Sequence, residues 1–151
     1  MKTGGGYEVK TIVATIKPEH VSNLRKRIKG FEVRKTAPTP PFKVLVCKSG
    51  SRGDVVAEFI VNEVLKTSMN DILAHNKLYL LDEARITWDG LCAYMHDHRG
   101  TRPIYFWKVS DFIDYYNTKG RRVLKVTELG LKRPPQSWQY IERGDVDHDG
   151  K

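Results

Sequence analysis

Apolar and polar positions along this chain form short runs that are separated by turns rich in glycine and proline. Runs of this length with β-branched or aromatic residues and alternating polarity are typical of strands. They predict strands over residues 9–16, 31–35, 43–48, 55–65, 104–109 and 137–142. The run at 104–109 (IYFWKV) is the most aromatic, and we expect it at the centre of a sheet. Residues 111–117 are ambiguous, and residues 122–127 fit a strand or a loop.

Helices are predicted at three places. Pro18 suits the first position of a helix, and apolar residues at helical spacing continue to about Lys29, where Gly30 is expected to end the helix. Ser68 is an acceptable N-cap for a helix over about 69–78, and a short helix is expected at 88–96. Strands and helices do not alternate regularly, which favours an α+β fold, a mixed β-barrel with two to three flanking helices, over a doubly wound sheet.

Composition limits the class of protein. The chain has 151 residues, 40% hydrophobic and 29% charged, which is ordinary for a soluble globular protein. We expect a disordered leader at 1–6, a single domain at 7–143 and an acidic flexible tail at 144–151. No apolar run approaches the roughly 20 residues of a membrane span, and no secretory signal is present. The sequence therefore predicts a cytoplasmic location and no membrane partner.

Charge is distributed unevenly around a formal net charge of +8. Lysine and arginine are concentrated in residues 17–48 and 102–143, while residues 49–101 carry more acidic than basic side chains. If the two basic blocks meet in the fold, they form a positive face of the kind that binds a polyanion. The alternative is a charged surface that only contacts solvent.

Motifs for phosphate loops, nucleophile elbows and metalloproteases are absent from the sequence. His96 and His98 flank Asp97, but no further cysteine or histidine completes a tetrahedral site. Cys47 and Cys92 cannot build a disulfide framework. We therefore expect no metal and no cofactor.

Two segments carry candidate chemistry. A strand at 31–35 presents Glu32 and Arg34 on one face, with Lys29 nearby and Phe31 on the opposite face. An acid beside two cations could bind a phosphate, and in an enzyme Lys29 would stabilise an anion while Glu32 acts as general acid or base. The alternative for this group is a surface salt bridge.

The second segment is KRPPQSWQY at residues 132–140. Its prolines favour an extended backbone, and Gln136 and Ser137 offer hydrogen bonds of the type that read base edges. Trp138 and Tyr140 either stack on bases or alternate into the core.

Taken together, these segments resemble the ASCH domain, a branch of the PUA-like superfamily. The matching pieces cover nearly all of residues 9–142: TIVATIKPEHVSNL, KGFEVRKTAPTPP, KVLVCKSG, VVAEFIVNEV, PIYFWKV and KRPPQSWQYIE. The family signature is GxKxxExR. Lys29, Glu32 and Arg34 match it, whereas Arg27 occupies the glycine position. The combination is similar to small stand-alone ASCH proteins of bacteria and phages.

The resemblance implies a small mixed β-barrel with a cleft beside the KxxExR strand that binds RNA or a modified nucleoside or nucleotide. It implies seven ligand-binding residues: Lys17, Lys29, Glu32, Arg34, Lys35, Gln136 and Ser137. Because Arg34 would point into the cleft, we expect Arg34→Ala to weaken binding and to leave the fold intact.

Two alternatives remain at this point. One is an ASCH-type hydrolase, either a ribonuclease or an amidohydrolase acting on N4-acetylcytidine. The amidohydrolases use a threonine nucleophile where this chain has Glu32, which argues against that reaction. The other alternative is a role in binding a protein partner.

Overall fold

A computed structural model describes residues 9–142, so the predicted leader (1–6) and tail (144–151) lie outside the described residues. The elements are β1 (Lys10–Ile16), α1 (Pro18–Arg25), β2 (Phe31–Arg34), β3 (Phe42–Lys48), β4 (Asp54–Val61), β5 (Val64–Thr67), α2 (Met69–Ala74), α3 (Tyr79–Ala84), α4 (Trp88–Met95), β6 (Ile104–Lys108), β7 (Ser110–Asp114), β8 (Leu124–Lys125), the 3-10 helix η1 (Val126–Leu129) and β9 (Trp138–Ile141).

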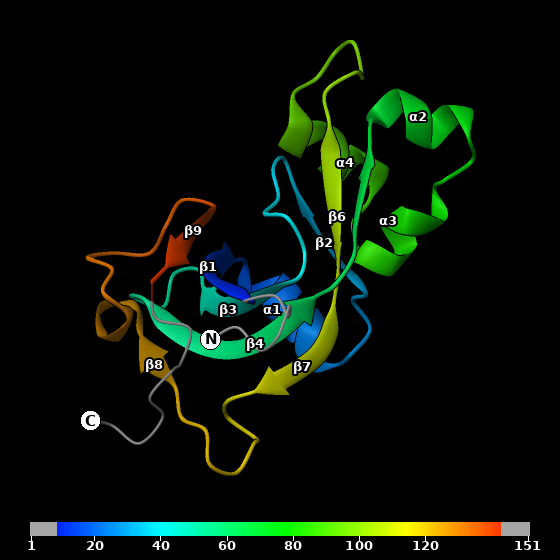
Figure 1. Cartoon of the computed structure of the whole chain (residues 1–151). Coiled ribbons are helices and arrows are strands. Elements are labelled where there is room, and N and C mark those ends of the chain that lie inside the picture. The colour runs from blue at the N-terminus through cyan, green and yellow to red at the C-terminus, as the bar shows by residue number, and fades with distance from the viewer. Residues whose placement is uncertain (1–8, 143–151) are drawn as a thin grey trace, which may run out of the picture.

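The strands form two sheets. The larger has the order β7-β4-β3-β1-β9, with β8 also paired to β4, and the smaller has the order β2-β6-β5. β1 and β3 are parallel, and every other pair is antiparallel. Helices α2, α3 and α4 lie beside the smaller sheet, and α1 lies with the larger one (Figure 1). The α+β class is confirmed, and the aromatic strand β6 is central in its sheet as predicted.

The barrel part of the prediction is not confirmed. Among the described strands, neither sheet closes on itself, because β7 and β9 end the larger sheet and β2 and β5 end the smaller one. The long strand expected at 55–65 is also wrong. It is two strands, β4 and β5, which belong to different sheets and are separated by the exposed residues Asn62 and Glu63. The chain changes sheets at this point.

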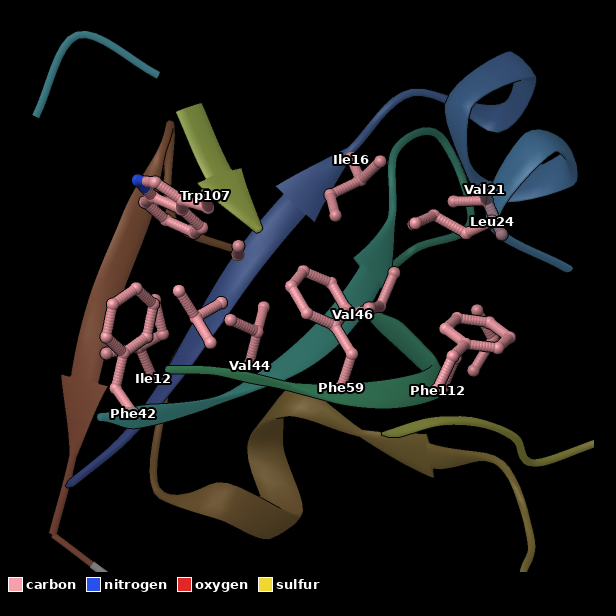
Figure 2. Close-up of a cluster of buried hydrophobic side chains, with 14 residues drawn as sticks. Ile12, Ile16, Val21, Leu24, Phe42, Val44, Val46, Phe59, Trp107 and Phe112 are labelled. Carbon is pink, nitrogen blue, oxygen red and sulfur yellow. The ribbon is translucent and has the colours of Figure 1, made fainter. Parts of the chain in front are cut away.

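The main core lies on one face of the larger sheet, where α1 and Trp107 of the smaller sheet pack against it. Ile12 of β1, Val44 of β3 and Phe59 of β4 are neighbours in register and project side by side, with Val21 and Leu24 of α1 covering one end of the row (Figure 2). Burying an apolar side chain of this size stabilises the fold by about 1.5–3 kcal/mol. A separate cluster covers the other face of the same strands, so β1 and β3 are buried on both faces. That explains their nearly continuous apolar sequences.

Helix α1 ends at Arg25, four residues before the predicted end, and Gly30 does not terminate it. Arg27 lies in the left-handed region with φ of 60°. Its amide donates to the Leu24 carbonyl, and the Ile28 amide donates to the Asn23 carbonyl, which is a Schellman motif. This position requires a left-handed residue, a conformation that glycine adopts without strain and that Arg27 adopts here.

The four α-helices within residues 9–142 exceed the two to three that were predicted. The Ser68 hydroxyl accepts a hydrogen bond from the Asp71 amide, as the predicted N-cap of α2, although that helix ends at Ala74. The helix that sequence reasoning missed is α3, which starts at Tyr79 and whose N-cap residue, Leu78, provides no side-chain cap. None of the helices in this range has both the length and the apolarity to cross a membrane.

Candidate functional site

A cavity of about 740 Å³ opens where β1, α1, β2, the start of α4 and the segment before β9 meet. We call it the first cavity. All seven residues that were predicted to bind a ligand line it: Lys17, Lys29, Glu32, Arg34, Lys35, Gln136 and Ser137. Sequence reasoning missed other residues of its wall, among them Thr15, His20, Thr36, Ser49, Arg85 and Tyr94. The fold thus brings residues 17–35 and 136–137 together.

The floor of the first cavity is a buried group of charges. The exposed fractions of Lys29, Glu32 and Arg34 are 4%, 4% and 7%. Arg34 Nε and Nη2 lie 2.9 and 2.8 Å from Glu32 Oε2, while Lys29 Nζ lies 3.6 Å from Glu32 Oε1. Burial raises the pKa of Glu32, but the charges of Arg34 and Lys29 outweigh it and hold that pKa below its ordinary value. Glu32 is therefore an ionised acceptor at neutral pH.

The Arg34 guanidinium is committed to the protein. Besides its bonds to Glu32, Nη1 donates to the carbonyl and hydroxyl oxygens of Ser137 at 3.1 Å, and Nη2 donates to the Thr15 carbonyl at 2.8 Å. Arg34 thus fastens β2 to the end of β1 and to the segment before β9. The expectation that Arg34→Ala would spare the fold is revised, because this side chain joins three segments of the chain.

Lys29 is also held by the fold. Its ammonium donates to the carbonyl of Ala84, the last residue of α3, at 2.5 Å and so satisfies one of the free carbonyls at a helix end. Burial lowers the pKa of Lys29, and the neighbouring Glu32 carboxylate opposes that shift. A buried ammonium with spare donors beside a carboxylate can bind a developing or resident anion.

Two buried polar atoms beside the cavity have no hydrogen-bond partner among the residues described: Glu32 Oε1 and His20 Nδ1. Burial lowers the pKa of His20, and the charge of Lys29 lowers it further, so the imidazole is neutral at neutral pH. Buried polar atoms are almost always paired in folded proteins, and those left unpaired at a cavity are available to a ligand.

The rim is more exposed and more basic than the floor. Lys17, Lys35 and Gln136 are exposed, and the Lys35 ammonium lies 4.8 Å from the centre of the Tyr94 ring. Counting the whole wall, five lysine or arginine side chains face two glutamates. No three histidine, cysteine, aspartate or glutamate side chains within residues 9–142 are placed to hold a metal ion.

The whole architecture is similar to solved structures of an ASCH protein from Zymomonas mobilis. The unmodified protein superposes with a TM-score of 0.65 at 17% sequence identity over 87% of each chain. A serine-to-alanine variant of it gives 0.66 at 16% identity over 87% of each chain, and a tyrosine-to-phenylalanine variant gives 0.66 at 17% over 87% and 89%. The chain has the ASCH fold. No protein-family model and no curated protein matches its sequence.

Within the ASCH fold, the aromatic residues of β9 divide between core and surface. Trp138 is half-buried and packs edge-to-face on Trp107, with the two ring centres 6.4 Å apart. Its indole N–H donates a hydrogen bond to the Thr36 hydroxyl at 3.0 Å. Tyr140 is 45% exposed and packs edge-to-face with Trp138, with the two ring centres 5.3 Å apart. Of the two alternatives weighed from the sequence, packing into the core describes Trp138, whereas Tyr140 is exposed and lies under the Lys10 ammonium, which is 5.4 Å from the centre of its ring.

The residues that were missed belong to segments with no chemical motif. His20 lies in α1, which follows β1 directly, and Arg85 and Tyr94 come from the end of α3 and from α4. Only the His20 position carried a usable signal, since it lies on the predicted helix one turn or less from Lys17. Arg85 and Tyr94 are distant in sequence and could not be assigned.

Proposed function

We propose that the first cavity binds RNA or a nucleotide. The observation that carries this proposal is Glu32 Oε1, a buried carboxylate oxygen that lies 3.6 Å from the Lys29 ammonium and accepts no hydrogen bond from the residues described, on the floor of a cavity with a basic wall. A carboxylate accepts hydrogen bonds from the amino and imino groups of a nucleobase, and the lysines of the rim attract phosphate. The ASCH fold supports the same proposal. This chain resembles the ASCH branch of the PUA-like superfamily, and PUA-like domains bind RNA in such clefts.

The ring of Tyr94 adds a surface for stacking. It is partly exposed at the cavity wall and lies under the Lys35 ammonium. Recognition of unpaired RNA relies on bases that stack on aromatic rings while their edges form hydrogen bonds. A base between Tyr94 and the Glu32 carboxylate would use both.

The test is a titration of a labelled single-stranded RNA of random sequence at about 50 and about 200 mM salt. Lys17→Ala and Lys35→Ala each remove an exposed rim cation, and Lys119→Ala is the matched control because it is exposed and does not line the first cavity. We expect each rim variant to bind several-fold more weakly. The salt slope, which is the steepness of the fall in log affinity with log salt concentration, should decrease by about 0.7, the value for one phosphate of a single strand. Absence of RNA binding at the lower salt, or an equal loss in the control, contradicts the proposal.

A hydrolase is the second candidate, and the closeness of Lys29 Nζ to Glu32 Oε1 favours it. Lys29 would stabilise an anion that develops in the transition state, and the lowered pKa of Glu32 suits a general base rather than a general acid. For the amidohydrolase, the chain lacks a hydroxyl at position 32. The hydroxyls of Thr15 and Thr36 in the wall are engaged with Pro135 and Trp138.

Glu32→Gln separates binding from catalysis. If wild-type protein cleaves labelled RNA in the presence of EDTA and the folded variant binds without cleaving, the protein is an enzyme. If both bind and neither cleaves, the protein is a binding module. Circular dichroism establishes in each case that the variant is folded.

A further inference from the structure

A second, shallower cavity of about 380 Å³ adjoins the first. The two cavities share one wall, formed by Arg85, Ile86 and Thr87 between α3 and α4. The remaining wall of the second cavity comes from the end of α1 and from α3. A ligand that fills the first cavity can therefore continue into the second by passing over this one short segment.

The second cavity combines an apolar floor with free polar groups. Ile28 is 42% exposed there and lies with Leu81 and Ile86. Asn23 and Asp82 stand at the same cavity, and within residues 9–142 neither side chain has a hydrogen-bond or ion-pair partner. A flat apolar surface beside an amide and a carboxylate suits a nucleobase, whose face is apolar and whose edge carries donors and acceptors.

Arg85 has features of a ligand-binding residue. It is exposed, and its side chain has no hydrogen-bond or ion-pair partner in the described part of the chain. Its backbone is left-handed, with φ of 57°, at the C-cap of α3, where glycine is the usual residue. The preceding carbonyl, that of Ala84, is fixed by Lys29 from the floor of the first cavity. An arginine therefore stands on an anchored segment between two cavities, with its planar fork free for a phosphate.

We propose that the second cavity holds the neighbouring nucleotide of a single-stranded RNA whose other nucleotide occupies the first cavity, with Arg85 contacting the phosphate that joins them. This inference rests on the proposed function. It narrows the ligand from RNA or a nucleotide to a single-stranded oligonucleotide of two residues or more.

The test uses fluorescein-labelled hexaribonucleotides of the four single-base sequences, titrated between about 50 and about 200 mM salt. Arg85→Gly removes the guanidinium at a left-handed position that glycine favours, so this variant should melt at or above the wild-type temperature. We expect it to bind the preferred hexamer at least fivefold more weakly, with a salt slope reduced by about 0.7. Arg85→Lys should restore most of the slope.

Ile28→Asp is the second variant, because it places a charge on the exposed apolar floor without emptying the core. It should also weaken hexamer binding several-fold. Arg102→Ala is the matched control, since Arg102 is exposed and lines neither cavity. Wild-type binding in Arg85→Gly and Ile28→Asp, or a loss no larger than in Arg102→Ala, overturns the two-cavity arrangement and leaves the proposed function standing. Failure of the wild-type protein to bind any hexamer at the lower salt refutes the proposed function and this inference with it.

Discussion

Replacement of Arg34 with alanine tests how the KxxExR strand is held in place. The side chain is 7% exposed and bonds to a carboxylate on its own strand, to the Thr15 carbonyl and to both oxygens of Ser137. Alanine removes every one of these bonds. It also leaves the buried Glu32 carboxylate with only Lys29 Nζ nearby, at 3.6 Å.

The size of the effect follows from burial. Removing one partner of a buried ion pair costs about 3–5 kcal/mol, because the remaining charge is left uncompensated. The free energy of unfolding of a whole domain is only about 5–15 kcal/mol, so Arg34→Ala should lose about a fifth of it or more. For a chain of this length each kcal/mol corresponds to roughly 2–4 °C, which predicts a melting temperature lower by about 6–20 °C.

Thermal melts and urea titrations measure this loss, with Lys35→Ala as the control. Lys35 is the next residue and carries the same charge, but it is exposed and its ammonium lies over the Tyr94 ring. Its removal should cost less than about 1 kcal/mol. If Arg34→Ala is no more destabilising than Lys35→Ala and RNA affinity falls instead, the guanidinium serves the ligand and the structural reasoning is wrong.

Two further predictions concern stability. Burial, and then the charge of Lys29, lower the pKa of His20 in the folded protein below its ordinary value of 6.5. The unfolded chain therefore binds a proton at His20 more readily than the folded protein does. The stability that the neutral His20 contributes is intact above about pH 6.5 and is lost as the pH falls from there through the folded-state pKa. His20→Gln should therefore flatten the decline of the urea midpoint from about pH 8 to about pH 5, and an unaltered decline would contradict this assignment. Gly53→Ala and Gly50→Ala both place a side chain at positive φ (89° and 80°), but only at Gly53 does the new Cβ meet an atom, Val126 Cγ2 at 2.9 Å. Gly53→Ala should be the less stable of the two in urea by about 1–3 kcal/mol, and equal midpoints would refute the packing argument.

The sequence alone determined most of the local structure. Strand β6, the Ser68 cap of α2 and helix α4 lie close to their predicted places, because period, capping residues and aromatic content act over a few neighbouring residues. The seven candidate residues also came from the sequence, and all of them line one cavity. Their role in binding stays a prediction, whereas their proximity is a property of the fold.

Tertiary structure alone decided how those residues are used. The sequence places Arg34 on the face opposite Phe31, but its partner Ser137 lies 103 positions away, so no local pattern could show that the guanidinium is already occupied. The same holds for the break between β4 and β5, where the chain changes sheets without a glycine or proline, and for Arg85, which stands between two cavities. Periodicity reports which face of an element is apolar, but which side chains meet depends on contacts between segments that are distant in the sequence.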